Sequence, residues 1–220
     1  MKSRRRKKDM AIEGFTARWY NKNTRRHRMK EMKEYASLVA MDLKPSDSVL
    51  ELAPGPGYLS IELAGMGDYK VFGVEISKTF VEIARGNARE ASVKVDFRQG
   101  NAADIPFPDE SFDAIACTAA FKNFKEPEKA LAEMHRVLKP GGTVFIVDMN
   151  REATDAQIDE ELEKMRSKGL EALFMRMTFK YFLRKGAYTR EEFRNMLAPM
   201  GWRSLNIVED GIGLRVWMKK

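Results

Sequence analysis

VLELAPGPGYLSIELA, residues 49–64, consists of an apolar run, a Pro/Gly turn and a second apolar segment. A short apolar run that meets such a turn and continues directly into a helix is typical of a buried strand in a parallel sheet. Gly55 and Gly57 allow a ligand to approach the backbone, and the start of the helix offers unpaired N–H groups. Taken alone, the segment equally fits a tight strand-to-helix turn without a ligand.

The same alternation of strands and helices continues along the chain. Short strands rich in Val, Ile and Phe are predicted at 48–53, 70–75, 93–99, 112–119 and 143–149. Helices are predicted between them at 58–64, 78–91 and 126–138. Strands that alternate with helices indicate a parallel sheet covered on both faces.

The alternation stops after residue 150. Residues 154–185 are expected to form a helical insertion that covers a ligand site, and residues 188–202 a helix capped by Thr189 with Glu192. Two strands follow at 204–210 and 214–220, and the GlyIleGly link between them permits only an antiparallel hairpin. No boundary between domains is visible, so residues 1–220 are predicted to form one domain.

Positive charge is concentrated at the N-terminus. The net charge of the whole chain is +7, whereas residues 1–30 hold 12 Lys/Arg and 2 Asp/Glu. We treat residues 1–23 as a basic N-terminal arm and residues 24–43 as a helix that Asn23 or Thr24 caps. The arm either contacts phosphates or another anionic surface, or is a solvated tail.

Several classes of protein are excluded by composition. One cysteine, Cys117, excludes an internal disulfide framework and a cysteine-rich zinc site, and we expect no metal site. No apolar run approaches the ~20 residues of a membrane span. The charged N-terminus lacks the apolar stretch of a secretory signal, so we expect a cytoplasmic protein.

Glu75 strengthens the case for a ligand at the glycine turn. It ends the predicted strand 70–75, and it follows Gly57 by 18 residues. An acid at this place, about 20 residues past the turn, can accept both hydrogen bonds of a ribose diol. A surface glutamate at a strand end is the simpler alternative, but the apolar residues before Glu75 disfavour it.

Together these segments resemble the class I S-adenosylmethionine-dependent methyltransferases, in particular the small-molecule group that includes quinone-biosynthesis methyltransferases. The resemblance covers about residues 30–150 and rests on VLELAPGPG, VFGVEIS, FRQGNAADIPFPDESFDAI and MHRVLKPGG. It implies S-adenosyl-L-methionine as the cofactor. It also implies an α/β, Rossmann-like fold with a seven-stranded, mostly parallel sheet, a C-terminal antiparallel hairpin and helices on both faces.

The resemblance further implies a set of cofactor-binding residues. They are Glu51, Ala53, Pro54, Gly55, Gly57, Glu75, Ile76, Asn101, Ala102 and Cys117, the last through its backbone carbonyl, and we add Tyr20, which with Trp19 could form a lid. Ala53 stands where the family has its first loop glycine, and its methyl group is tolerated if its φ is negative. Asn101 replaces an adenine-contacting aspartate, and its amide oxygen can still accept a hydrogen bond.

A nicotinamide enzyme is the main competitor for such a fold. Its Gly-x-Gly-x-x-Gly fingerprint requires a third glycine, but Tyr58 and Leu59 follow Gly57 and no glycine comes directly after them. The closing antiparallel hairpin also fits the methyltransferase sheet better.

No catalytic residue is evident, because in-line methyl transfer depends mainly on alignment and needs a base only when the acceptor must lose a proton. Weak candidates for a catalytic role are His27, Lys122 and Asn123. Acceptor contacts are predicted from Phe121, Lys122 and Asn123 after the fourth strand, and from Phe174 and Met177 in the helical insertion. The insertion could instead be an amphipathic helix packed on the core.

Three functions remain open. The sequence favours methylation of a small, apolar or aromatic acceptor, because one domain with a covering insertion has no separate recognition module. An RNA methyltransferase that uses the basic arm is the alternative, and a non-catalytic cofactor-binding protein is a third. The acceptor atom and the oligomeric state stay open.

Overall fold

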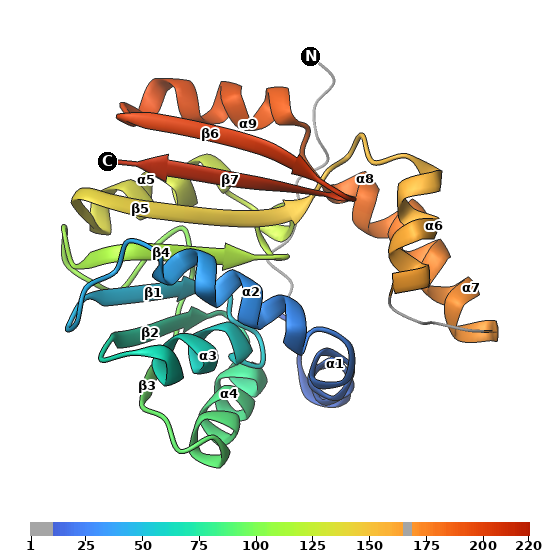
Figure 1. Cartoon of the computed structure of the whole chain (residues 1–220), viewed down its shortest axis with the longest axis horizontal. Helices are drawn as coiled ribbons and strands as arrows, with labels where there is room; N and C mark the ends of the chain where they lie inside the picture. The colour runs from blue at the N-terminus through green and yellow to red at the C-terminus, as the bar shows by residue number, and fades with distance from the viewer. Residues whose placement is uncertain (1–10, 165–168) are drawn as a thin grey trace.

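A seven-stranded sheet forms the centre of the structure, a computed structural model that describes residues 11–164 and 169–220 (Figure 1). Its strands are β1 (Ser48–Leu52), β2 (Lys70–Glu75), β3 (Val95–Gln99), β4 (Phe112–Thr118), β5 (Leu138–Met149), β6 (Ser204–Asp210) and β7 (Gly213–Lys219). Their order is β3-β2-β1-β4-β5-β7-β6. The pairs among β1 to β5 are parallel, and β7 is antiparallel to both β5 and β6. The predicted fold class, including the C-terminal hairpin, is confirmed.

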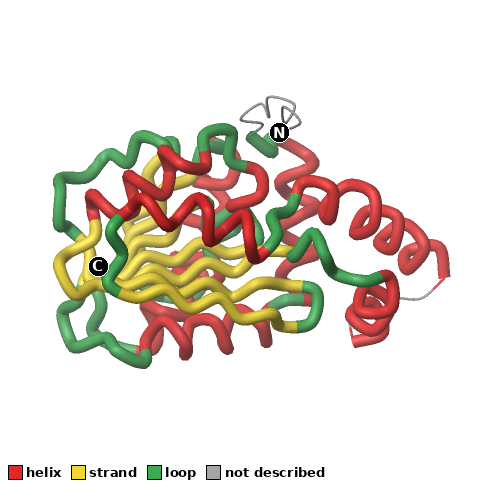
Figure 2. Tube along the Cα trace, turned by 90° about the horizontal axis from the view of Figure 1, so that it is seen from above, coloured by secondary structure: helices red, strands yellow, loops and turns green. Residues whose placement is uncertain are grey.

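Helices cover both faces of the sheet (Figure 2). They are α1 (Gly14–His27), α2 (Met29–Ala40), α3 (Tyr58–Met66), α4 (Lys78–Glu90), α5 (Pro127–Val137), α6 (Asp155–Lys164), α7 (Gly169–Met177), α8 (Arg184–Gly186) and α9 (Arg190–Leu197). Short turns of other helix types are η1 (Phe121–Asn123), the π-helical η2 (Thr178–Leu183) and η3 (Ala198–Met200). Figure 1 shows α2, α3 and α4 on one face, with α5 and α9 on the other.

Alternate residues of the central strands enter two hydrophobic cores. On β5, Val144 and Ile146 pack on the side of α5 and α9, whereas Phe145 and Val147 pack on the side of α2, α3 and α4. This follows from the two-residue period of a strand. Because both faces of the sheet are buried, its strands are continuous apolar runs in the sequence. The positions of the strands could therefore be predicted accurately.

The N-terminal region differs from the prediction. The helix predicted over 24–43 is two helices, α1 and α2, separated at Arg28, which has φ −118° and ψ 3°. α1 begins at Gly14, so Thr24 is a buried residue inside a helix and not its cap. Residues 14–23 of the predicted arm are therefore helical. The basic run at residues 2–8 lies outside the described residues.

The predicted helical insertion is present as α6, α7, η2 and α8, with residues 165–168 outside the described part of the chain. β5 is longer than expected, because it starts at Leu138 and not at residue 143. Leu138 pairs with Phe112, and the register shifts before Ala114. The capping box of α9 is confirmed, since Thr189 accepts from the N–H of Glu192 and Glu192 accepts from the N–H of Thr189.

Candidate functional site

The candidate site lies where the order of the strands reverses. β1 and β4 are neighbours in the sheet. The next strand after β1 is added on one side of this pair, and the next strand after β4 is added on the other side. In open α/β sheets, ligands bind at this switch point, beyond the carboxyl ends of the strands. Figure 1 shows α1 and the helical insertion at the same end of the sheet as the carboxyl end of β4.

The loop after β1 contains three residues with positive φ. Ala53, Gly55 and Gly57 have φ values of +54°, +53° and +83°. The expectation that Ala53 has a negative φ is therefore wrong, and its methyl group is held in the left-handed region. Such strain is often found at ligand sites, where the surrounding fold keeps it in place.

We expect Ala53→Gly to stabilise the fold by about 0.5–1 kcal/mol. The left-handed conformation costs an L-residue about 1–2 kcal/mol, and the extra freedom of glycine in the unfolded chain offsets part of the gain. Urea unfolding of both proteins measures the difference. A glycine variant that is less stable than the wild type would show that the methyl contacts outweigh the backbone strain.

Gly55 and Gly57 serve different purposes in this loop. A Cβ on Gly55 would have Tyr20 Cε1 as its nearest neighbour, at 4.0 Å, an ordinary van der Waals distance, so Tyr20 lies over the loop at Gly55. A Cβ on Gly57 would lie 2.6 Å from Phe97 Cζ and 2.9 Å from Ala84 Cβ. Gly57 is thus required by the packing of the loop on the protein, and its contact with a ligand stays a prediction.

Glu75 lies against this loop. Its Oε2 accepts the N–H of Gly55 at 3.0 Å, and its Oε1 accepts the N–H of Ser77 at 2.9 Å. Burial raises the pKa of the Glu75 carboxyl, and the two N–H groups oppose this. Each carboxylate oxygen has a second lone pair for another donor.

The N-terminal segment that contains Glu13 and Tyr20 packs against the loop after β1 and the start of α4. The carboxylate of Glu13 accepts the N–H groups of Lys78 and Thr79 at 3.0 Å each, which caps the start of α4. Tyr20 packs edge-on against Phe80, with ring centroids 5.7 Å apart. This places Tyr20, but not the half-exposed Trp19, over the loop.

Asn21 attaches α1 to the loop region directly. Its Oδ1 accepts the hydroxyl of Tyr58 at 2.8 Å and the side-chain amide of Asn87 at 3.1 Å. Asn87 also donates to the carbonyl of Pro56 at 2.9 Å. α1, the loop and α4 are therefore connected by one set of hydrogen bonds.

Glu51 on β1 is buried beneath the loop. Its Oε2 accepts both the N–H of Ser60, at 2.9 Å, and the Ser60 hydroxyl. Burial raises the pKa of Glu51 to about 7, although the bonds from Ser60 act in the opposite direction. Glu51 thus anchors the first turn of α3 from inside the core.

The loop after β3 holds the residues predicted to contact adenine. Asn101 Oδ1 accepts the N–H of Ala103 at 2.9 Å, and Ala102 is half-buried against the core. Ile76, at the end of β2, accepts the side-chain amide of Gln99 through its carbonyl at 3.2 Å. These residues, with Glu75, lie along the carboxyl ends of β2 and β3.

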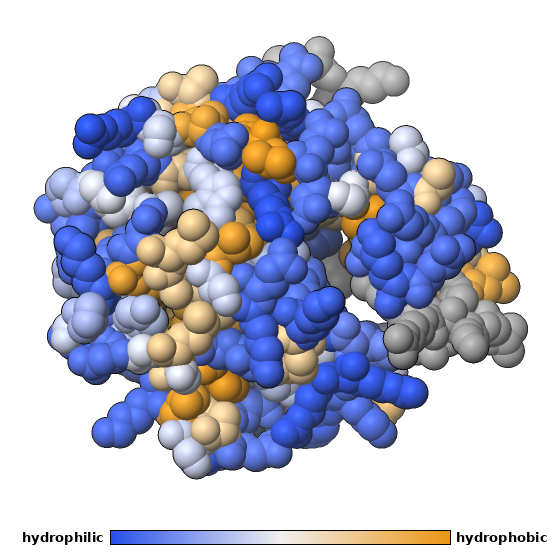
Figure 3. All heavy atoms as spheres, in the orientation of Figure 1, coloured by the Kyte–Doolittle hydropathy of each residue, from blue (hydrophilic) through white to orange (hydrophobic). Residues whose placement is uncertain are grey.

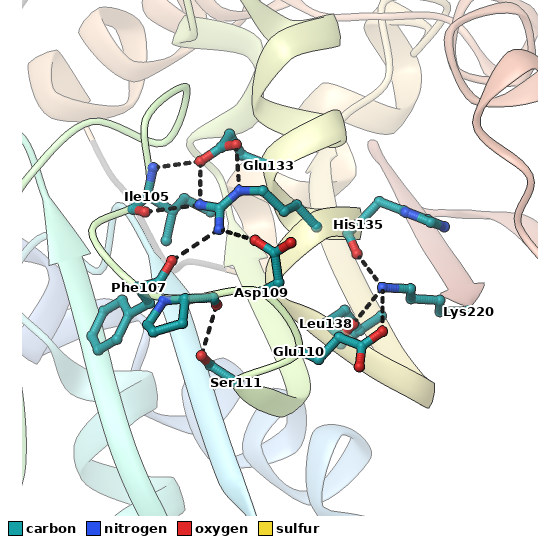
Figure 4. A network of polar contacts seen from close by, with 11 residues as sticks. Ile105, Phe107, Asp109, Glu110, Ser111, Glu133, His135, Leu138 and Lys220 are labelled. Atoms are coloured by element: carbon teal, nitrogen blue, oxygen red, sulfur yellow. Dashed lines mark hydrogen bonds and ion pairs between the residues drawn. The ribbon is translucent and has the colours of Figure 1, made fainter.

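The β3–β4 connection lies against α5, with Ile105, Phe107 and Asp109 close to Glu133 (Figure 4). Arg136 on α5 holds this connection in place. It donates to the carbonyls of Ile105 and Phe107 at 3.0 and 2.9 Å. It also pairs with Asp109 at 2.8 Å and with Glu133 at 2.7 Å. Because Glu133 in turn accepts the N–H of Ile105, the connection is attached to α5 at both backbone groups of that residue.

Of the three residues after β4 that were predicted to contact the acceptor, two are buried and one is exposed. The Phe121 ring is fully buried and stacks on Phe193, with centroids 5.1 Å apart, so it belongs to the core. Lys122 is also buried, and its ammonium pairs with Asp148 at 2.9 Å. Asn123 is exposed, and its backbone N–H donates to the carbonyl of Ala120. Cys117 is a buried thiol whose pKa is raised by burial and by Asp148.

Phe174 and Met177 lie on an exposed face of the insertion. Their exposed fractions are 64% and 51%, and Leu173 and Tyr181 are exposed beside them. Hydrophobic residues also reach the surface at the outer end of the insertion in Figure 3. Met175, Phe179 and Leu183 instead pack against buried residues of α6 and β5. The covering role predicted for the insertion stays a prediction.

His27 ends α1 and is half-buried. Among the described residues, no cluster of three or more His, Cys, Asp or Glu side chains is arranged to hold a metal ion. No helix in the described ranges is long and apolar enough to cross a membrane.

Three residues of this region were missed by sequence reasoning: Glu13, Asn21 and Arg136. An acid before a helix is a common cap, so the sequence held a sign of the role of Glu13, but the helix that it caps is α4 and not α1. Asn21 and Arg136 act through partners distant in sequence, and no local pattern indicates them.

Comparisons with known proteins find relatives for the central part of this chain. A family described as "Methyltransferase domain" matches residues 50–146. Demethylmenaquinone methyltransferase of Deinococcus radiodurans is 36% identical over 101 residues, which are 46% of this chain and 42% of that protein. The 2-phytyl-1,4-naphtoquinone methyltransferase of Synechococcus elongatus is 37% identical over 112 residues, 49% of this chain and 48% of that protein. The chain thus spans about half the length of these relatives.

The fold as a whole has close counterparts among solved structures. A candidate S-adenosyl-L-methionine-dependent methyltransferase from Methanococcus maripaludis superposes with a TM-score of 0.75 at 23% identity, over 96% of this chain and 97% of that one. At this identity the likeness shows the fold. Residues 50–146 are thus similar to a methyltransferase domain, and the chain as a whole shares its fold with S-adenosylmethionine-dependent methyltransferases.

Proposed function

We propose that the chain transfers a methyl group from S-adenosyl-L-methionine to a small aromatic acceptor of the quinone type. The carrying observation is the carboxylate of Glu75, fixed against the N–H of Gly55 in the loop that Tyr20 covers. The names of the two relatives support the acceptor class, since one acts on demethylmenaquinone and the other on a phytyl-naphthoquinone.

The residues at this edge suit the cofactor. Glu75 would hold the ribose hydroxyls, Gly55 and the start of α3 would face the methionine portion, and Asn101 with Ala102 would lie beside the adenine. When bound, the cofactor supplies a methyl group with positive charge at its sulfur. Tyr20 would cover the bound group, which excludes water and aligns the acceptor. We assign no general base.

Glu75→Gln tests the ribose assignment. The amide can still accept from Gly55 or Ser77, but it loses the charge and one acceptor oxygen. We therefore expect the affinity for S-adenosyl-L-methionine to fall by about 1.5–3 kcal/mol, or tenfold or more. Calorimetric titration measures this, and Glu82→Gln, at an exposed position of α4, is the matched control. Unchanged affinity in a folded variant would remove Glu75 from the site.

The acceptor class is tested with methyl-labelled cofactor and a panel of acceptors. The panel contains reduced naphthoquinones with and without an isoprenoid tail, simple phenols, thiols, amines and bulk RNA. We expect label in the reduced naphthoquinones. Label in another small molecule would overturn the quinone assignment and leave methyl transfer standing, and cofactor binding without any transfer would favour a non-catalytic role.

RNA is the second candidate acceptor, because residues 1–30 carry 12 of the 39 Lys/Arg of the chain. Deleting residues 2–8 separates the two functions. If the acceptor is a small molecule, turnover is expected to stay within about twofold, since these residues provide mainly long-range charge. If it is RNA, methylation falls and its dependence on salt concentration becomes weaker.

A further inference from the structure

A buried ion pair joins the carboxyl ends of β4 and β5. The ammonium of Lys122 lies 2.9 Å from Asp148 Oδ1, and the exposed fractions of the two side chains are 6% and 1%. Asp148 also accepts the backbone N–H groups of Lys122 and Met149, each at 2.7 Å. The carboxylate is thus surrounded by three donors, all from residues at this edge of the sheet.

The same ammonium controls the backbone turn after β4. It donates to the carbonyl of Ala119, a residue with φ +56°. The N–H of Ala119 donates to Val147 on β5 at 2.7 Å. Alanine does not prefer this left-handed conformation. Contacts on both sides of Ala119 therefore hold the turn in a strained shape.

This turn leaves the sheet beside the loop after β1. The register pairs Glu51 of β1 with Ala116 of β4, and the strands end within a few residues, at Leu52 and Thr118. Ala53 and Ala119 follow the two ends, and both have positive φ. The two strained turns thus flank the switch point where the cofactor is expected.

We propose that Lys122 and Asp148 are positioning residues that hold the Ala119 turn in the shape that binds S-adenosyl-L-methionine. The ion pair acts through the backbone and does not touch the acceptor. A buried ammonium already bound to a carboxylate and a carbonyl is poorly placed to contact the acceptor, which was its predicted role. The proposal rests on cofactor binding and not on the identity of the acceptor.

Three variants separate positioning from simple stability. Lys122→Met leaves a buried carboxylate unpaired and is expected to lower the melting temperature strongly. Lys122→Met combined with Asp148→Asn removes both charges and should recover much of that loss. Lys139→Met is the matched control, because Lys139 pairs with Asp113 at 2.7 Å between the same two strands, at their amino ends.

The readouts are the melting temperature and the affinity for S-adenosyl-L-methionine by calorimetry. We expect the double variant to bind at least tenfold more weakly than the wild type, although its stability is largely restored, because the Ala119 carbonyl still lacks its ammonium donor. Lys139→Met should lose stability and bind within about twofold of the wild type.

Restored affinity together with restored stability in the double variant would overturn the proposal, since the pair would then only neutralise buried charge. If the double variant does not fold, Asp148→Asn alone, which is isosteric, decides the question, and wild-type affinity in it would also overturn the proposal. A wild-type chain that does not bind the cofactor would overturn the proposed function itself and this inference with it.

Discussion

Gly57→Ala is expected to destabilise the fold by about 2–5 kcal/mol, the sum of a backbone and a packing effect. At φ +83° the left-handed backbone costs alanine about 1–2 kcal/mol. The new Cβ would lie 2.6 Å from Phe97 Cζ and 2.9 Å from Ala84 Cβ, and overpacking of this kind costs about 1–3 kcal/mol. Phe97 is itself buried, so it cannot move into solvent. Urea unfolding monitored by circular dichroism measures the loss.

Gly141→Ala is the matched control for this prediction. Its φ is +81°, almost the same as that of Gly57, but a Cβ there would meet no atom within 4 Å. Only the backbone cost of about 1–2 kcal/mol is therefore expected. Adding Phe97→Leu to Gly57→Ala should recover part of the packing loss. Equal losses at Gly57 and Gly141 would contradict the close packing of the loop on Phe97.

Glu51 is expected to make the stability of the fold depend on pH. Its folded pKa is raised from 4.5 to about 7, mainly by burial. A raised folded pKa means that the folded state holds the proton more tightly, so the stabilisation is complete below pH 4.5 and is lost as the pH rises through about 7. From these two pKa values, the loss is on the order of 3 kcal/mol.

Unfolding of the wild type and of Glu51→Gln at pH 4.5, 6 and 8 tests this dependence. The amide stays neutral at each pH and can still accept from Ser60. The stability of the wild type relative to this variant should therefore fall between pH 4.5 and 8. Glu82→Gln, at an exposed position of α4, controls for the amide substitution. Parallel profiles for the wild type and Glu51→Gln would show that Glu51 is ionised throughout.

The sequence located the elements of the sheet because its strands are buried on both faces. An apolar run that is bounded by turn residues indicates a strand that is buried on both faces. The start of α1 was missed for the opposite reason. Its buried residues are Ala17 and Thr24, which form no apolar stripe, and its place is fixed by polar contacts of Glu13 and Asn21.

Some features of the candidate site could likewise be predicted from the sequence, whereas others could not. The sequence by itself determined the glycine turn, the acid at the end of β2 and the resemblance to methyltransferases, because these depend on residue type and spacing along the chain. Only the tertiary structure decided that Lys122 pairs with Asp148, 26 residues away, and that Phe121 belongs to the core. It also decided the positive φ of Ala53. The physical reason is that local patterns record whether a residue is buried, whereas its partner and its backbone strain are set by segments that meet only after folding.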